Sequence, residues 1–145
     1  MSLFNLSDKV YAVTGASGAL AGKAAQYLAE NGARVAFISR NQSKLDLAVK
    51  DLGPEVATFT CDVTDRKALK TSFDLILQRF GHIDGLINGA GGNMPGATIS
   101  PDMSVFDLDF NDYEKVLQLN LSGTLLPSLV VADHFAERNA GGTAT

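Results

Sequence analysis

The sequence predicts an α/β fold in which a doubly wound parallel sheet carries helices on both faces. Three observations support this prediction. Short apolar runs alternate with longer segments whose apolar residues recur at helical spacing, which is the pattern of strands joined by crossover helices. The runs are almost continuously apolar, as expected of parallel strands buried on both faces. Glycine or small polar residues follow them, and ligands bind at the carboxyl ends of strands in open sheets.

Four strands are predicted, each from a short and mainly apolar run. The first covers residues 10–14 and is followed by Gly15, and the second covers 34–39. The third covers 56–60, and the fourth covers 84–87, just before a glycine-rich turn. Because parallel strands need crossover connections, a helix is expected after each strand.

Four helices are predicted between and after these strands, over residues 19–31, 43–52, about 65–80 and about 112–138. We expect Ser43 to cap the second helix, and Thr64 or Asp65 to begin the third. Glycine closes each of the first three. Pro127 lies inside the last helix, where we expect a kink. The segment 93–111 is predicted to be a long loop that faces the substrate region. Its acidic residues are expected to solvate it or to cap the next helix at Asn111-Asp112, and the alternative is that they approach a polar substrate.

Length and composition limit the classes of function. The chain has 145 residues, enough for one domain or part of one. Its 16 acidic and 12 basic residues form no basic stripe, so we expect no nucleic-acid partner. The apolar runs are far shorter than a membrane span, and no signal peptide is recognisable, so we expect a cytoplasmic protein with no membrane partner. The single cysteine, Cys61, excludes an internal disulfide, and no metal site is predicted.

The turn after the first strand contains glycines at Gly15, Gly18 and Gly22. A glycine turn between strand and helix lets backbone approach a pyrophosphate, which the helix N-terminus then binds. We expect Gly15 to form the tight turn and Gly18 to allow the close approach. Ala21 or Gly22 would permit close packing of helix and strand. The alternative is a glycine-rich turn that binds no ligand.

The second and third strands end in residues suited to the adenosine part of a dinucleotide. Ser39 stands where an acidic residue would favour NAD, and Arg40, followed by Asn41, can accommodate the 2′-phosphate of NADP. Asp62 can accept a hydrogen bond from the adenine amino group. The alternatives are that Arg40 is an exposed surface charge and that Asp62 caps the next helix. Cys61 is expected to be a small buried residue.

The fourth strand and the last helix each present an asparagine. Asn88, followed by Gly89 and Ala90, can tie adjacent strands together through backbone groups, while the small residues leave room for a ribose. Asn120 lies mid-helix, where an amide facing a core needs partners. The alternative for Asn120 is a position facing the surface.

These motifs, in this order, resemble those of the short-chain dehydrogenase/reductases, from Ser7 onward. The resemblance rests on Thr14-Gly15 with its glycine turn, Asp62-Val63, and the segments 88–91 and 120–123. It implies a Rossmann-type sheet, here its N-terminal portion. Segments 86–93 and 123–127 resemble the D-mannonate oxidoreductase (fructuronate reductase-like) branch. The turn departs from the family pattern T-G-x-x-x-G-x-G, because Gly18 comes one residue early and Ala19 replaces the second glycine.

The resemblance implies a role for each motif in binding NADP or NAD, with NADP favoured by Ser39-Arg40. It places Gly15, Ser17, Gly18 and Leu20 at the pyrophosphate; Arg40 and Asn41 at the adenosine ribose; Asp62 and Val63 at the adenine; and Asn88, Gly89 and Ala90 at the cofactor ribose. Asn120 matches the asparagine that helps to hold a proton-relay water near the catalytic lysine. The resemblance also implies a homo-oligomer that acts on a small-molecule substrate.

The chemistry of the family requires a serine, a tyrosine and a lysine four residues after the tyrosine, which lowers the tyrosine pKa. The residues four positions after the three tyrosines are Gly15, Asn31 and Leu117, so the chain contains no Tyr-x-x-x-Lys pair. We therefore expect residues 1–145 to be an NAD(P)-binding Rossmann domain truncated before the catalytic segment, leaving its fourth strand at an unpaired edge.

The expected function is hydride transfer between nicotinamide and a carbonyl or secondary alcohol, on a sugar acid such as D-mannonate or fructuronate. Two alternatives remain open. One is a non-catalytic nucleotide-binding module or truncated fragment. The weaker one is a nucleotide-sugar epimerase, suggested by the spacing of Gly15 and Gly18.

Overall fold

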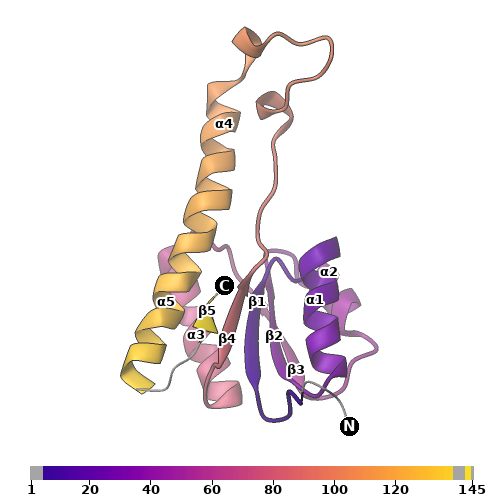
Figure 1. Cartoon of the computed structure of the whole chain (residues 1–145), viewed down its shortest axis with the longest axis vertical. Coiled ribbons are helices and arrows are strands. Elements are labelled where there is room, and N and C mark those ends of the chain that lie inside the picture. The colour runs from indigo at the N-terminus through magenta and orange to yellow at the C-terminus, as the bar shows by residue number, and fades with distance from the viewer. Residues whose placement is uncertain (1–4, 139–142, 145) are drawn as a thin grey trace.

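The computed structural model describes residues 5–138 and 143–144, and it confirms the predicted fold class. A parallel sheet of five strands lies at its centre, in the order β3-β2-β1-β4-β5 (Figure 1). The strands are β1 (Val10–Thr14), β2 (Arg34–Ser39), β3 (Val56–Thr60), β4 (Gly85–Asn88) and β5 (Thr143–Ala144). This order brings the ends of β1, β2 and β4 together.

The first three strands have the predicted bounds, and β4 begins and ends one residue later than predicted. The prediction of an unpaired edge on β4 is wrong over its first two residues. Gly85 pairs with Thr143, and Leu86 pairs with Ala144, in parallel register. The fifth strand therefore lies beside the fourth.

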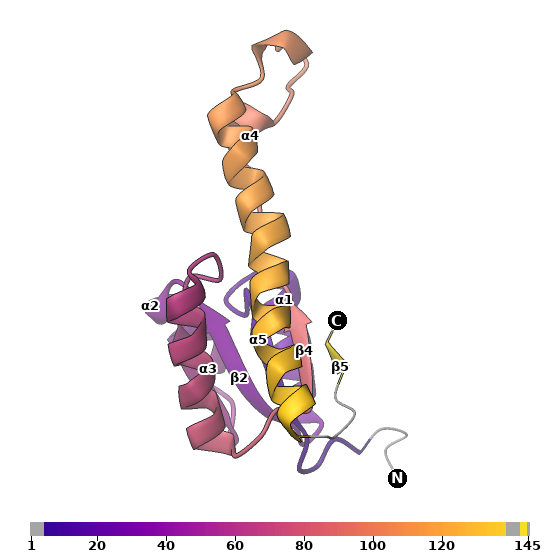
Figure 2. The ribbon, with the colours of Figure 1, turned by 90° about the vertical axis from the view of Figure 1, so that its left-hand side faces the viewer.

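Two layers of helices cover the sheet. The first comprises α1 (Ala19–Glu30) and α2 (Gln42–Val49), and the second comprises α3 (Arg66–Phe80) and α5 (Gly123–Arg138) (Figures 1 and 2). Alternation along the strands separates two cores. Val13, Val35 and Phe37 pack with α1 and α2. Val10, Ala12, Ala36 and Ile38 pack with α3 and α5. Burial on both faces explains why these strands are continuously apolar in sequence.

The helix caps differ from the prediction at α2. The side chain of Asn41, not of Ser43, caps this helix, because its Oδ1 accepts a hydrogen bond from the Lys44 N–H at 2.9 Å. The helix ends at Val49 rather than at residue 52. Asp65 caps α3, as one of the two predicted alternatives, and accepts from the N–H groups of Lys67 and Ala68. Gly81 ends α3 at φ 84°, which suits glycine.

The last predicted helix is a continuous helical stretch in three parts. These are α4 (Phe110–Leu117), a π-helical turn (Gln118–Ser122) and α5. We expected a kink at Pro127. The hydrogen bonding departs from the α-helical pattern in the π-turn before it, and Pro127 itself is buried within α5. By length and composition alone, Phe110–Arg138 could cross a membrane. Within this stretch, Gly123, Pro127 and Val131 are buried.

Residues 93–117 form an arm that extends beyond the carboxyl edge of the sheet (Figures 1 and 2). It contains two short 3₁₀ turns, Pro95–Ala97 and Val105–Asp107, followed by α4. The cap of α4 is Asp109, not the predicted Asn111-Asp112, because its Oδ1 accepts from the Asp112 N–H at 3.0 Å. Asp112 instead accepts a hydrogen bond from the Gly96 N–H at 3.0 Å through Oδ2. That the arm faces substrate stays a prediction.

Candidate functional site

The turn between β1 and α1 can form only with glycine at its first position. Gly15 has φ 67°, and a Cβ there would lie 2.4 Å from the Gly89 carbonyl oxygen. At Gly22, one of the two residues expected to permit close packing, a Cβ would lie 2.8 Å from the Ala16 carbonyl oxygen, so this glycine lets α1 pack closely on the turn. These two glycines therefore shape the turn by contact with the protein itself.

Gly18 has a different environment. It is the N-cap of α1 with no side-chain hydrogen bond, and a Cβ there would meet only the Gly15 carbonyl oxygen, at 3.1 Å. The first turn of α1 contains no acidic residue. Its N–H groups and the positive end of the helix dipole are therefore suited to an anion, and the small Gly18 leaves room for one.

Thr14 joins the turn to the end of β4. It is fully buried, and its hydroxyl oxygen accepts hydrogen bonds from the N–H groups of Gly89, at 3.1 Å, and Ala90, at 3.2 Å. Sequence reasoning did not assign this role to Thr14. The available signal was a hydroxyl residue at the end of an otherwise apolar strand.

A cleft lies along the carboxyl ends of the strands, beside this turn. Seven predicted residues line it: Gly15, Ser17, Gly18, Arg40, Val63, Gly89 and Ala90. Four further lining residues were not predicted as site residues: Ser39, Cys61, Gly91 and Leu119. The cleft has a volume of about 180 Å³. This is less than the roughly 300–1,000 Å³ of pockets that enclose a ligand, so the groove would line one side of a larger molecule.

Five predicted residues lie outside the wall of the cleft, each within two positions of a lining residue: Leu20, Asn41, Asp62, Asn88 and Asn120. Leu20 is 90% exposed on the first turn of α1. Asn41 caps α2, as described above. The remaining three make hydrogen bonds that hold the strand ends and the helix in place.

Two hydroxyl groups connect the glycine turn to β2. The Oγ atoms of Ser17 and Ser39 are 2.6 Å apart, and the Asn41 N–H donates to Ser39 Oγ at 3.4 Å. An acidic residue at position 39 would place a negative charge at this junction. With serine there, the junction between β1 and β2 is neutral, and Arg40 follows it.

Asp62 is held at the end of β3 by its neighbour Thr64. Its Oδ1 accepts from the Thr64 N–H at 2.9 Å and from the Thr64 hydroxyl at 2.7 Å. These hydrogen bonds, and more weakly the charge of Arg40, lower the pKa of Asp62 below its usual value, despite some burial. The alternative that Asp62 caps the next helix is wrong, since Asp65 is the N-cap of α3.

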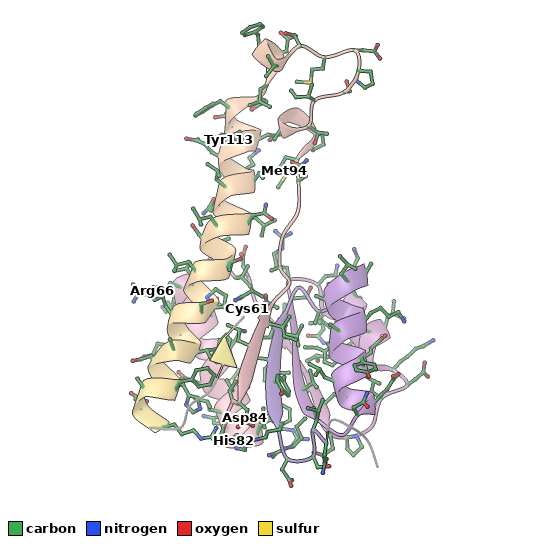
Figure 3. All side chains as sticks on the ribbon, in the orientation of Figure 1. Cys61, Arg66, His82, Asp84, Met94 and Tyr113 are labelled. Carbon is green, nitrogen blue, oxygen red and sulfur yellow. The ribbon has the colours of Figure 1, made fainter. Side chains whose placement is uncertain are left out.

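Cys61, beside Asp62, is buried as predicted, and burial raises the pKa of its thiol. Figure 3 shows it near the carboxyl end of the sheet, where it lines the cleft. The higher pKa means that Cys61 contributes a neutral thiol to this wall.

Asn88 and Asn120 each form hydrogen bonds to distant parts of the chain. Asn88 Nδ2 donates to Ser128 Oγ on α5 at 2.9 Å, and that Asn88 also bonds backbone groups of neighbouring strands stays a prediction. Asn120 is exposed rather than core-facing. Its Nδ2 donates to the Gly92 carbonyl oxygen at 2.7 Å, and its Oδ1 accepts from the Gly92 N–H at 3.2 Å. The backbone after β4, not a core, satisfies this amide.

The contact between Asn120 and the strand end also involves the π-turn. Asn120 Nδ2 donates to the Val116 carbonyl oxygen at 2.9 Å, and a Cβ on Gly91 would lie 2.7 Å from Asn120 Oδ1. Gly91 therefore allows the loop to approach the helix, and Asn120 fixes the position of the arm at its base.

Comparison with known proteins agrees with this geometry. Residues 9–143 match the family model described as short chain dehydrogenase. The chain belongs to the short-chain dehydrogenase family. This match confirms the resemblance seen in the sequence motifs. Members of this family are NAD(P)-dependent oxidoreductases.

Individual relatives have diverse substrates. The oxidoreductase UxuB of Bacillus subtilis, whose activity is uncharacterised, is 36% identical over 87% of this chain and 49% of its own length. The D-threitol dehydrogenase of Mycolicibacterium smegmatis is 32% identical over 95% of this chain and 52% of its own length. The chain thus spans about half the length of the curated relatives it matches.

Solved structures of the family have the same fold. A candidate D-mannonate oxidoreductase from Haemophilus influenzae, crystallised with bound NAD, matches with a TM-score of 0.80 and 34% identity. The match covers 89% of this chain and 51% of that one. A short-chain dehydrogenase from Bacillus anthracis matches with a TM-score of 0.84 and 29% identity, over 94% of this chain and 55% of that one.

Proposed function

We propose that this chain supplies the cofactor-binding half of an oxidoreductase that transfers a hydride between nicotinamide and a carbonyl or secondary alcohol. The observation that carries the proposal is the glycine turn. Gly15 adopts a conformation that suits glycine, and Gly18 lies over the open N-terminus of α1, where no acidic residue competes for the N–H groups. When bound, the dinucleotide would donate or accept the hydride.

The residues of the cleft would divide the dinucleotide among them. Gly15, Ser17, Gly18 and Leu20 would bind the pyrophosphate through the turn and the first turn of α1. Arg40 and Asn41 would lie at the adenosine ribose, and Asp62 and Val63 at the adenine. Asn88, Gly89 and Ala90 would lie at the second ribose. Support comes from the fact that seven of these eleven residues line the same cleft, and the other four lie within two positions of one.

We propose that the preferred cofactor is NADP. Ser39 is neutral and is hydrogen-bonded to Ser17, so no carboxylate at that position would repel a 2′-phosphate. Arg40 lines the cleft directly after it. A guanidinium group binds phosphate well, because its planar donors match the phosphate oxygens. The NAD found in the Haemophilus influenzae structure belongs to that protein and makes the comparison of the two cofactors the decisive test.

Titration calorimetry of the chain with NADP⁺ and with NAD⁺ tests this proposal, and is suitable because the chain contains no tryptophan. We expect Arg40→Asp to weaken NADP⁺ binding about tenfold or more, through loss of a charge-assisted contact, and NAD⁺ binding much less. The matched control is Arg66→Asp, at an exposed position on α3 that does not line the cleft. Equal loss of both cofactors would contradict the NADP preference. Failure of the unmodified chain to bind either cofactor would contradict the proposed function.

We further propose that the acid/base pair of the reaction lies in a segment after residue 145, since this chain contains no Tyr-x-x-x-Lys. Asn120 would support that chemistry by fixing the base of the arm. A sugar acid such as D-mannonate is the proposed substrate, supported by the resemblance to that branch. We expect the 145-residue chain to bind the dinucleotide without oxidising D-mannonate or D-threitol. Turnover by this chain alone would contradict the division into two halves.

We also propose that the protein forms a homo-oligomer through the outer face of its last helical stretch. Four leucines at intervals of four residues are 44–66% exposed there: Leu117, Leu121, Leu125 and Leu129. Such a stripe is typical of a helix that packs on a partner. Analytical ultracentrifugation of the chain and of Leu121→Glu would test this proposal. A monomer at all concentrations would contradict it.

A further inference from the structure

The exit segment of β4, residues 88–92, forms part of one wall of the cleft and is held by different elements along its length. Residues 89–91 line the cleft. From β1, the buried Thr14 hydroxyl accepts hydrogen bonds from the first two N–H groups of that stretch. From the π-turn, the side chain of Asn120 bonds both backbone groups of Gly92. The middle and the far end of the exit segment are therefore fixed by residues described above.

The start of the exit segment is held from α5, which runs beside β4 (Figure 2). Asn88, the last residue of β4, donates from Nδ2 to Ser128 Oγ at 2.9 Å. The Ser128 hydroxyl itself donates to the Thr124 carbonyl oxygen, four residues earlier in the helix, at 2.7 Å. Asn88 and Ser128 are both half-buried, so little water competes for this contact. Ser128 therefore joins α5 to the first residue of the exit segment.

The hydrogen bonds of Ser128 have a fixed direction. A serine hydroxyl carries one proton, and the Thr124 carbonyl oxygen accepts it. Toward Asn88 the hydroxyl oxygen can then only accept, so it selects the amide nitrogen rather than the amide oxygen. Ser128 therefore determines which end of the Asn88 amide faces α5, and with it the orientation of this side chain at the start of the exit segment.

Helix stability alone does not account for a hydroxyl at this position. A serine or threonine that bonds the carbonyl oxygen four residues earlier slightly destabilises a helix. Thr71 of α3 and Thr124 of α5 make such bonds at exposed positions. Ser128 makes the same kind of bond, but it is half-buried and also accepts a hydrogen bond from the sheet. The contact with Asn88 is what distinguishes Ser128 from the other two residues.

We propose that Ser128 is a positioning residue for the ribose on the nicotinamide side of the dinucleotide. This inference rests on the proposed function, in which Asn88, Gly89 and Ala90 lie at that ribose. Ser128 acts through the Asn88 amide, without touching the ligand. Without its hydroxyl, the amide nitrogen loses the acceptor that orients it, and the start of the exit segment is less well fixed. The first turn of α1 lies outside this contact, so the adenosine side should bind as before.

Titration calorimetry with Ser128→Ala tests the proposal, because each dinucleotide can be compared with its own adenosine half. The pairs are NADP⁺ with adenosine 2′,5′-bisphosphate, and NAD⁺ with adenosine 5′-diphosphate. We expect Ser128→Ala to weaken both dinucleotides about fivefold, the usual effect of one lost hydrogen bond, and both adenosine halves less than about twofold. A merely structural role would weaken each dinucleotide and its adenosine half equally.

Further variants complete the test. Ser128→Thr keeps a hydroxyl that can accept from Asn88 and donate to the earlier carbonyl, so it should restore dinucleotide affinity to within about twofold. Thr71→Ala is the matched control, because it removes a hydroxyl with the same bond along α3, outside the cleft, and it should change none of the four affinities. Circular dichroism reports the fold of each variant. Ser128→Cys, whose thiol is a weak acceptor, replaces Ser128→Ala if alanine prevents folding.

Three results would overturn the inference and leave the proposed function standing. They are unchanged dinucleotide binding to Ser128→Ala, equal losses for the dinucleotides and their adenosine halves, and failure of Ser128→Thr to restore affinity. In each case the unmodified chain still binds the dinucleotides. If the unmodified chain binds neither NADP⁺ nor NAD⁺, the proposed function fails and the inference fails with it.

Discussion

The Cβ of Ala21 lies only 2.3 Å from the position that a Cβ on Gly89 would take. Helix α1 therefore approaches the end of β4 as closely as a glycine there permits. The same glycine lies against Gly15, whose own Cβ would meet the Gly89 carbonyl oxygen at 2.4 Å. Gly15 and Ala21 thus share one crowded point with Gly89, which is distant in sequence, and the sizes of the three residues must be matched.

This contact predicts a strong coupling between positions 21 and 89. Gly89→Ala should lower the free energy of unfolding by about 1–3 kcal/mol, the usual cost of forcing a side chain into a packed site. Ala21→Gly alone should cost about 1 kcal/mol, because glycine is a poor helix former. In the double variant, the clash with Ala21 is removed, so the loss should be smaller than the sum of the two. Urea unfolding of all four proteins measures this.

Strict additivity of the two substitutions would contradict the close contact. Some loss should remain in the double variant, since a Cβ on Gly89 would also lie 2.8 Å from the Thr14 carbonyl oxygen. Gly22→Ala is a useful comparison. Its Cβ would meet Ala16 rather than Gly89, so it should not couple with substitutions at position 89.

Two of the strands could be predicted from sequence because burial on both faces leaves an almost unbroken apolar run. This applies to β1 and β2, whereas β3, at the edge of the sheet, is only partly buried and includes two threonines. The N-cap of α2 could not be predicted, because Asn41 and Ser43 are both good N-cap residues. The conformation of the chain after β2 selects Asn41. Residues 141–145 resemble the start of the family's fifth strand, which the family places beyond the fourth, and Thr143 and Ala144 do pair with β4.

The site was predictable where one residue type serves one local purpose. Gly15 could be identified because a tight turn requires a positive φ. The contacts of Asn88 with Ser128 and of Asn120 with Gly92 could not be identified, since these partners lie 40 and 28 residues away in sequence.

The amide of Asn120 should control the order of the loop after β4. Asn120→Ala removes both hydrogen bonds to Gly92, at about 1 kcal/mol each, and should increase hydrogen exchange at the Gly92 N–H. Asn120→Asp keeps an acceptor for the Gly92 N–H but places a carboxylate against the Gly92 carbonyl. We therefore expect it to preserve protection of the Gly92 N–H better than alanine does. Identical exchange in both variants would contradict this account.

The arm should depend on Gly96. A Cβ there would lie 2.7 Å from Asp109 Cβ and from Asp112 Oδ2, which itself accepts the Gly96 N–H. Gly96→Ala should separate the loop from α4 and speed chymotryptic cleavage at Phe106, which is already 94% exposed. The melting temperature of the sheet should change little, because the arm lies outside both cores. Gly53→Ala, where a Cβ meets nothing within 4 Å, is the control.

Stability should fall as the pH drops below the ordinary histidine range, because His134 must remain neutral. The Ile83 N–H donates to His134 Nε2 at 3.3 Å, so this nitrogen acts as an acceptor and cannot carry a proton. Burial, with the charge of Arg138, lowers the pKa of His134 below 6.5, although Glu137 and Asp84 oppose this. His82 and Asp84 lie close together nearby, at the end of the sheet opposite Cys61 (Figure 3).

The direction of the effect follows from proton counting. Between the lowered pKa of folded His134 and 6.5, the unfolded chain binds more protons than the folded one, so the free energy of unfolding rises with pH in that window. His134→Gln keeps an acceptor that does not titrate. We expect unmodified chain and variant to differ more at pH 5 than at pH 7, with the unmodified chain losing more stability on acidification. Parallel pH profiles of stability would show that folding does not change the pKa of His134.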